Sequence, residues 1–173
     1  MNEVQVAGEE RPTFTIRAGG PEDDALIAEH FRQMWLDNGV SVERISETWR
    51  EDVLAFVGAA RQAHQYRSFL AEQGPGKVVG SASCQLFAGL YPNILQAKQR
   101  KYGYVWGVYV QADCRKRGIA TALTQATLEH LRAIACSHAL LHASPSGRSV
   151  YESLAFQPTN EMRLDLSLPL SEA

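Results

Sequence analysis

The stretch over residues 102–110 constrains the fold more than any other part of the chain. It is aromatic and β-branched apart from two glycines, so it is too apolar for a sheet edge and predicts a central strand. After a short turn, Gly118 opens a stretch of helical period that runs to Ala135, with Ile119 and Leu123 on its inward side. A central strand that leads directly into a helix predicts a sheet and helices packed in layers.

The rest of the chain alternates between helical and strand periods, and no repeat or linker divides it. We therefore expect a mobile tail over residues 1–12 and a single domain of the α/β (α+β) class over residues 13–173. The other predicted elements are a strand around Phe14 and Ile16, a helix over 21–38, a helix capped by Ser46, strands over 66–72 and 77–87 joined by a hairpin turn, a long connection over 89–101, a strand over 139–143, a helix over 146–154 and a strand over 162–168.

The two N-terminal helices are predicted to bury one apolar face each. The residues at helical spacing are Leu26, Ile27, Phe31, Met34 and Trp35 in the first helix, and Trp49, Val53, Phe56, Val57 and Ala60 in the second. Trp35, Trp49 and Trp106 could also shape a binding pocket, although core packing is the better interpretation of each.

Composition excludes several classes of protein. A hydrophobic content of 45% with a net charge of -2 is typical of a globular protein without general attraction to nucleic acid or anionic membrane. No apolar run approaches the ~18 residues of a membrane span, and the N-terminal residues lack the apolar core of a signal peptide. Cys84, Cys114 and Cys136 are widely spaced, so we expect reduced thiols, no metal site and a cytoplasmic protein.

The turn between the predicted central strand and its helix is a candidate anion site, formed by Arg115, Lys116, Arg117, Gly118, Ile119, Ala120 and Thr121. A helix N-terminus carries unpaired N–H groups and about half a positive charge, so it attracts phosphate. Basic side chains here oppose the helix dipole, which a purely structural design would avoid. The G-x-G-x-x-G and G-x-x-x-x-G-K motifs are absent, so dinucleotide and nucleoside triphosphate sites lack their signatures. A solvated basic turn is the alternative.

The turn resembles the hallmark of the GNAT superfamily of N-acetyltransferases. That hallmark is a strand followed by [QR]-x-x-G-x-[GA] at the start of a helix, and Arg115, Gly118 and Ala120 match it. A second block lies downstream in the right order and spacing, and the likeness covers roughly residues 102–166.

The downstream block in such families often reads N-x-x-A-x-x-L-Y-E-x-x-G-F. Residues 144–156 keep its Tyr151-Glu152 pair and its final Phe156. The departures from the pattern are Ser144 for Asn, Gly147 for Ala, Val150 for Leu and Ala155 for Gly. The retained residues favour an unchanged helix geometry.

The resemblance implies a GNAT-like mixed, mostly antiparallel sheet, flanked by helices and splayed beside the strand that ends at Val110. It also implies acetyl-CoA as the cofactor. The pantetheine arm would pair with free backbone groups at Val108, Tyr109 and Val110, and the pyrophosphate would lie on the amides of residues 117–121. Arg115 and Lys116 would add positive charge, and Ser144 would lie within reach of pantetheine.

The implied reaction is direct attack of a primary amine on the thioester, in a ternary complex, with the amine carried by a small molecule, peptide or protein. Tyr151 is the candidate general acid for the departing thiolate, because its ordinary pKa of about 10 keeps it protonated. The alternative is that Tyr151 only packs, with its hydroxyl bonded to backbone. The candidate general bases, each better explained as a surface or packing residue, are Glu29, His30, Glu47, Glu51 and His142.

Other functions fit parts of the pattern. The lack of an obvious base leaves open a non-catalytic acyl-CoA-binding regulatory module. Nucleic-acid binding through the basic turn is disfavoured by the acidic overall balance. Lys98, Arg100 and Lys101, in the long connection, could read an acidic acceptor or cover the site, although a solvated charge run is the simpler interpretation. Proteins of this kind are often homodimers, and no segment of this sequence decides that question.

Overall fold

The computed structural model describes residues 13–163. Its helices and strands are β1 (Thr15–Gly19), α1 (Asp24–Asp37), α2 (Trp49–Ala63), β2 (Arg67–Glu72), β3 (Val78–Leu86), β4 (Tyr102–Val110), α3 (Ile119–Ala133), β5 (His138–Leu140) and α4 (Arg148–Ser153). The predicted tail and most of the predicted strand over 162–168 lie outside the described residues. Met162 and Arg163, which are described, are not part of a strand.

The five strands form one mixed sheet in the order β1-β2-β3-β4-β5. The first four strands pair antiparallel, and β5 pairs parallel to β4. A turn closed by a hydrogen bond from the N–H of Gln73 to the carbonyl of Lys77 joins β2 and β3 as the predicted hairpin. The predicted fold class is therefore confirmed.

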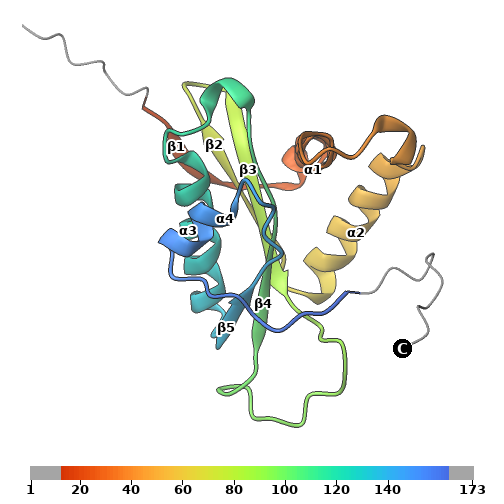
Figure 1. The fold of residues 1–173 in the computed structure, drawn as a ribbon, viewed down its shortest axis with the longest axis vertical. Helices are drawn as coiled ribbons and strands as arrows, with labels where there is room; N and C mark the ends of the chain where they lie inside the picture. Colours follow the sequence, from red (N-terminus) through yellow and green to blue (C-terminus); the bar gives the residue numbers. More distant parts are fainter. Residues whose placement is uncertain (1–12, 164–173) are drawn as a thin grey trace, which may run out of the picture.

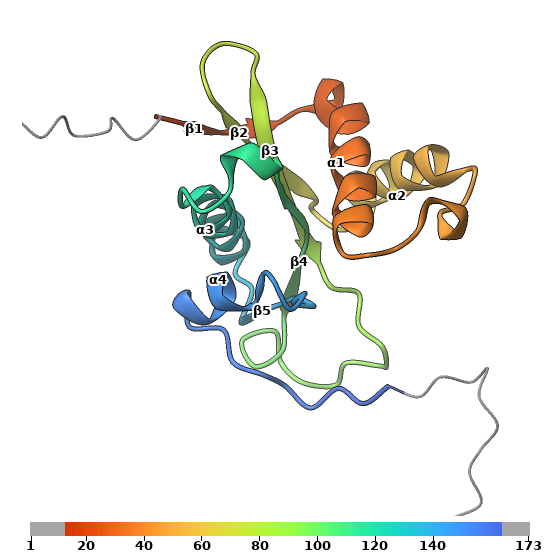
Figure 2. The same ribbon diagram turned by 45° about the horizontal axis from the view of Figure 1, so that its top comes forward.

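Helices cover both faces of the sheet (Figure 1). In this view α3 lies on one side of the strands, and α1 and α2 lie on the other. Figure 2 shows α4 beside α3. The buried residues between α3 and the sheet fall into two clusters, one made of Ala71, Val79, Ala82, Val110, Cys114, Ile119 and Leu123 and the other of Cys84, Val105 and Leu131. These contacts fix the start of α3 relative to the end of β4.

The sheet opens between β4 and β5. Residues 102–104 of β4 pair with β5, and within the described chain no strand pairs with residues 105–110 on that side. On the other side, the register of β3 and β4 shifts between Ser81 and Ser83, where Gly107 adopts a positive φ of 62°. This bulge places Trp106 and Tyr109 against α1, where they contact Phe31 and His30 respectively.

The predicted inward face of α1 is partly wrong. Its buried residues are Ile27, Ala28 and His30, whereas Leu26 and Trp35 are 36% and 45% exposed. The small Ala28 faces the core, where its size allows α1 to pack closely. His30 can be buried because its ring nitrogen pairs with a hydroxyl of the sheet.

The start of α2 also differs from the prediction. Ser46 does not cap the helix, which begins at Trp49 with Thr48 at the N-cap position. The Ser46 hydroxyl instead accepts a hydrogen bond from the N–H of Thr48 at 3.2 Å, and so forms the tight turn before the helix. On its predicted inward face, Val57 and Ala60 are buried but Phe56 is 51% exposed.

Candidate functional site

The N-terminus of α3 presents a row of free amide groups. Gly118 lies just before the helix in the left-handed region, with φ of 81°, and Lys116 also has a positive φ of 60°. The first helical hydrogen bond runs from the N–H of Ala122 to the carbonyl of Gly118 at 3.0 Å. Within residues 13–163, the amides of residues 117–121 have no acceptor. Together with the helix dipole, they form a site suited to an anion.

Two of the three basic side chains at this turn form hydrogen bonds or ion pairs with other residues of the chain. Arg115 donates from Nε to the carbonyl of Val110 at 2.9 Å and pairs with the carboxylate of Asp37 on α1. Arg117 donates to the carbonyl of Asp113 at 2.8 Å. Lys116 forms no hydrogen bond or ion pair with the described residues. Arg115 therefore links the turn to β4 and α1, and Lys116 is the cation most available to a ligand.

The free edge of β4 continues from this anion site. Gln111 donates its N–H to the carbonyl of Val79 at 2.9 Å, on the β3 side. Because backbone groups of successive strand residues point to opposite edges, those of Val110 point to the open side. The Arg115 side chain already bonds the Val110 carbonyl there. The open edge thus leads from the anion site along β4 toward its start.

Tyr151 lies on α4 with an unbonded hydroxyl. Its ring packs edge-on against Phe156, with 5.9 Å between ring centroids. A Cβ at Gly147 would lie 3.2 Å from Cε2 of Tyr151, so this glycine allows the close turn before the helix. The hydroxyl makes no hydrogen bond with the described residues, and the backbone bond of the alternative interpretation is therefore absent from them. Burial raises the pKa of Tyr151, so the phenol stays protonated at neutral pH.

Ser144 is engaged in the turn that precedes α4. Its hydroxyl accepts a hydrogen bond from the N–H of Gly147 at 3.2 Å and pairs with the Ser146 hydroxyl at 3.2 Å. Its carbonyl accepts from the N–H groups of Gly147 and Arg148, each at 3.1 Å. A contact from Ser144 to a ligand would compete with these local bonds.

The predicted base candidates occupy different environments. His30 is buried, with Nδ1 2.9 Å from the hydroxyl of Ser81, and burial lowers its pKa to about 4. It is therefore a neutral packing residue. Glu29 pairs with Arg32 at 3.3 Å, while Glu47 and Glu51 are exposed. His142 contacts two further polar side chains, Tyr104 and Glu161, which the sequence patterns did not single out.

Aromatic side chains line the face of β4 that meets α1 and α2. Trp106 packs against Phe31 and Phe56, with ring centroids 5.3 and 5.5 Å apart. A pocket of about 410 Å³ between α1, α2 and the loop that joins them is lined in part by Phe31, Trp35 and Trp49. Trp35 and Trp49 are thus pocket residues, whereas Trp106 forms the packed layer beneath.

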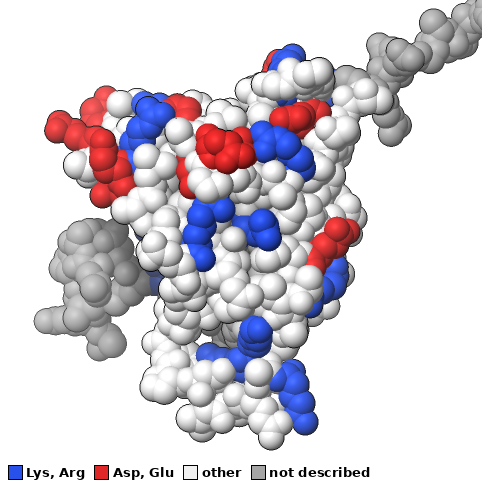
Figure 3. Space-filling view, turned by 180° about the vertical axis from the view of Figure 1, so that it is seen from behind, with Lys and Arg blue, Asp and Glu red and all other residues white. Residues whose placement is uncertain are grey.

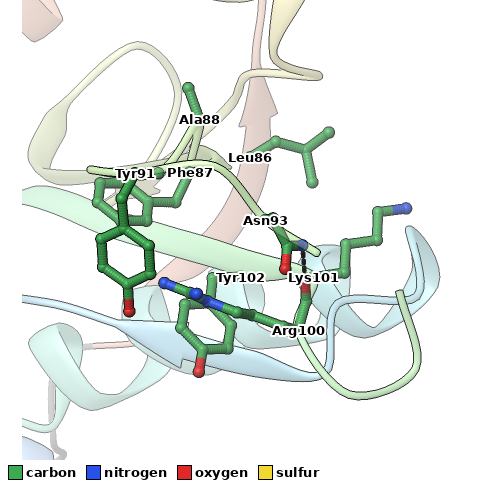
Figure 4. Close-up of a pocket in the computed structure, with 9 residues that line it drawn as sticks. Leu86, Phe87, Ala88, Tyr91, Asn93, Arg100, Lys101 and Tyr102 are labelled. Atoms are coloured by element: carbon green, nitrogen blue, oxygen red, sulfur yellow. Dashed lines mark hydrogen bonds between the residues drawn. The ribbon is translucent and has the colours of Figure 1, made fainter. Parts of the chain in front are cut away.

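A smaller pocket of about 170 Å³ lies beside the long connection between β3 and β4 (Figure 4). The guanidinium of Arg100 stacks over Tyr91, 4.1 Å from its ring centroid, and Asn93 donates to the Arg100 carbonyl at 2.7 Å. Lys101 donates to the carbonyl of Ile134 at 2.5 Å. Figure 3 shows only basic charge on this end of the molecule in that view. Arg100 and Lys101 therefore hold the connection in place.

The fold and the site define a class of protein. The model of the acetyltransferase (GNAT) family matches residues 26–156, and the chain therefore belongs to the GNAT family of acetyl-CoA-dependent N-acetyltransferases. No curated protein sequence matches the chain.

Solved structures share the fold. A GCN5-related N-acetyltransferase from Ralstonia eutropha JMP134 has a TM-score of 0.75 at 22% identity, over 90% of this chain and 99% of that one. An acetyltransferase from Clostridium acetobutylicum, solved with acetyl-CoA, has a TM-score of 0.76 at 21% identity, over 90% and 97%. The aminoglycoside N-acetyltransferase AAC(6')-Iy, solved with CoA, has a TM-score of 0.63 at 21% identity, over 88% and 93%. At these identities the likeness is one of fold.

Residues 13–163 contain no group of three or more His, Cys, Asp and Glu side chains arranged to hold a metal ion. None of the helices in that range has the length and apolar character that crossing a membrane requires.

Proposed function

We propose that this chain transfers the acetyl group of acetyl-CoA to a primary amine of a small molecule, peptide or protein, by direct attack in a ternary complex. Two observations together carry the proposal: residues 105–110 of β4 leave one strand edge unpaired within the described chain, and the amides of residues 117–121 at the N-terminus of α3 have no acceptor there. An extended arm that contains amides can pair with a strand edge. A pyrophosphate can accept hydrogen bonds from the amides of residues 117–121.

When bound, acetyl-CoA supplies the activated acyl group, and the residues of the chain supply binding, orientation and proton transfer. A backbone N–H at residues 108–110 donates to the negative charge that develops on the carbonyl oxygen. Tyr151 donates its proton to the departing sulfur, and its raised pKa and unbonded hydroxyl support this role. The aromatic pocket between α1 and α2 lies on the face from which the acceptor approaches.

The direct test is release of free CoA from acetyl-CoA over a broad panel of primary amines. Turnover of at least one amine is expected, with acetyl-CoA affinity that weakens in Lys116→Ala. Acetyl-CoA binding without turnover of any amine would instead support the non-catalytic acyl-CoA-binding module.

The role of Tyr151 has its own test. We expect Tyr151→Phe to lower kcat by about 10²-fold while the KM for acetyl-CoA stays within about twofold, as general acid catalysis predicts. Tyr102→Phe, which removes a hydroxyl without a hydrogen bond in the described structure, is the matched control. Equal turnover in both variants across the pH range would overturn the assignment.

A further inference from the structure

Three polar side chains from separate segments meet on one side of the sheet. Tyr104 lies on β4, His142 follows β5, and Glu161 lies in the segment after α4. The hydroxyl of Tyr104 donates to Nδ1 of His142, and the opposite ring nitrogen, Nε2, lies 2.5 Å from a carboxylate oxygen of Glu161. A carboxylate accepts but does not donate, so Glu161 selects the tautomer with hydrogen on Nε2 and leaves Nδ1 as the acceptor.

The position of these residues relates them to the reaction. Tyr104 is the last β4 residue that pairs with β5, through Leu140, so the group lies where the two strands separate. Its side chain shares a face with Trp106, two residues further on, because strand residues alternate. In the proposed complex the donor enters at α3 and runs along β4 from Val110 and Val108. Its reactive end therefore points toward Tyr104.

Stability does not account for this arrangement. The side chains of His142 and Glu161 are 66% and 65% exposed, and exposed ion pairs contribute only about 0–1 kcal/mol. The ring of Phe87 stacks on Tyr104 with 5.8 Å between centroids, which holds the phenol in place. Tyr104 and Glu161 are the titratable groups that the described structure places in contact with the imidazole. Burial, and then the charge of Glu161, raise the pKa of Tyr104, so it is a neutral hydroxyl that can donate and accept together.

We propose that Tyr104, His142 and Glu161 form the proton relay that deprotonates the acceptor amine, which rests on the function proposed above. The acceptor enters as an ammonium ion, and one of its N–H protons passes to the oxygen of Tyr104 before the freed nitrogen lone pair attacks the acyl carbon. The hydroxyl proton of Tyr104 passes at the same time to Nδ1 of His142. The resulting imidazolium is stabilised by the Glu161 carboxylate and later releases its proton to water. Tyr104 is the catalytic residue, and His142 and Glu161 are positioning residues that act through it.

The relay separates the two proton transfers of the reaction. It removes a proton from the amine on the α1 and α2 side of β4, whereas Tyr151, on α4, supplies one to the departing sulfur. Among the other base candidates, burial lowers the pKa of His30 to about 4, and Glu29 already has one carboxylate oxygen paired with Arg32 at 3.3 Å.

The test compares Tyr104→Phe, His142→Gln and Glu161→Gln with His138→Gln. His138 is an exposed histidine whose ring packs against Tyr102 and whose Nδ1 lies 3.1 Å from the Ser137 hydroxyl. With the best acceptor of the amine panel, we expect kcat to fall by about 10²-fold in the first two variants and about tenfold in Glu161→Gln. The ratio of parent kcat to variant kcat should fall as pH rises toward the pKa of the acceptor, because more of the amine is then already deprotonated. The KM for acetyl-CoA and the His138→Gln rates stay within about twofold of the parent.

The outcomes are distinguishable. If the parent turns over an amine but Tyr104→Phe and His142→Gln match His138→Gln across pH, the relay is wrong and the proposed function stands. If the parent binds acetyl-CoA and turns over no amine, both are wrong. Glu161→Gln replaces one oxygen on an exposed side chain, so it keeps the inference testable if another variant misfolds. A pH-independent loss in all three variants would indicate a purely structural role and would also overturn the relay.

Discussion

Leu131 of α3 packs directly against Gly103 of β4, and the dependence of one residue on the other can be measured. Leu131 is 2% exposed. A Cβ at position 103 would lie 2.4 Å from Cδ2, 2.7 Å from Cδ1 and 2.9 Å from Cγ of Leu131. Because Cγ is included, rotation of the terminal methyl groups cannot relieve the clash. Gly103→Ala must therefore displace the whole leucine side chain.

The expected magnitudes follow from these contacts. Leu131→Ala removes three buried carbons and leaves a cavity, at a cost of about 3 kcal/mol in unfolding free energy. Gly103→Ala alone costs about 2 kcal/mol through overpacking. In the double variant the new methyl group enters the space that Leu131 vacates. We therefore expect a total cost of about 3 kcal/mol, which is a coupling of about 2 kcal/mol between the two sites.

Urea denaturation of the four proteins in the cycle measures this coupling. For a chain of this size, Leu131→Ala should lower Tm by about 6–12 °C, and adding Gly103→Ala should lower it little further. Leu123→Ala combined with Gly103→Ala is the control pair, because the Leu123 side chain instead lies beside Gly80 and the two costs should add. If the losses of unfolding free energy in Gly103→Ala and Leu131→Ala simply add in the double variant, the predicted contact between the two residues is wrong.

Three further predictions concern other parts of the chain. The pKa of His30 is lowered from 6.5 to about 4, so as pH falls the histidine is protonated in the unfolded chain before it is protonated in the folded one. The free energy of unfolding should therefore fall by up to about 3 kcal/mol between pH 6.5 and pH 4. In His30→Gln, the urea concentration at the unfolding midpoint should depend less on pH over that range. Gly118→Ala should cost about 1 kcal/mol through its positive φ and weaken CoA binding in calorimetry, whereas unchanged binding would exclude a tight backbone approach. Burial raises the pKa of Cys84 to about 12, so a thiol reagent at pH 8 should modify Cys136 first and reach Cys84 only on unfolding, as peptide mass mapping can show.

The sequence was informative where local chemistry decides the structure. The apolar strand over 102–110, the glycine before α3 and the hairpin after β2 each follow from residue types a few positions apart. The geometry of the turn before α3 was predictable for the same reason. Its amides become free wherever a helix begins, and its glycine adopts the left-handed backbone that other residues avoid.

Prediction from the sequence was weaker where tertiary contacts decide which residues are buried or brought together. The burial of His30 depends on Ser81, which lies on β3, so helical spacing alone favoured Trp35 instead. The proposed relay could not be predicted from the sequence because Tyr104, His142 and Glu161 come from three separate segments. Tyr104 fits an apolar strand, and Glu161 lies beside a predicted strand that extends beyond the described residues.

The free edge of β4 also bears on self-association. An unpaired strand edge can add any extended segment, including one from a second copy, and folded proteins usually cover or charge such an edge. Here the apolar residues 105–110 border it, and no described strand protects it. An arm of donor lying along β4 would occupy the same hydrogen-bonding groups as an added strand. Bound acetyl-CoA would then prevent a second copy from pairing with this edge. The chain would be most prone to aggregate when CoA and its thioesters are scarce.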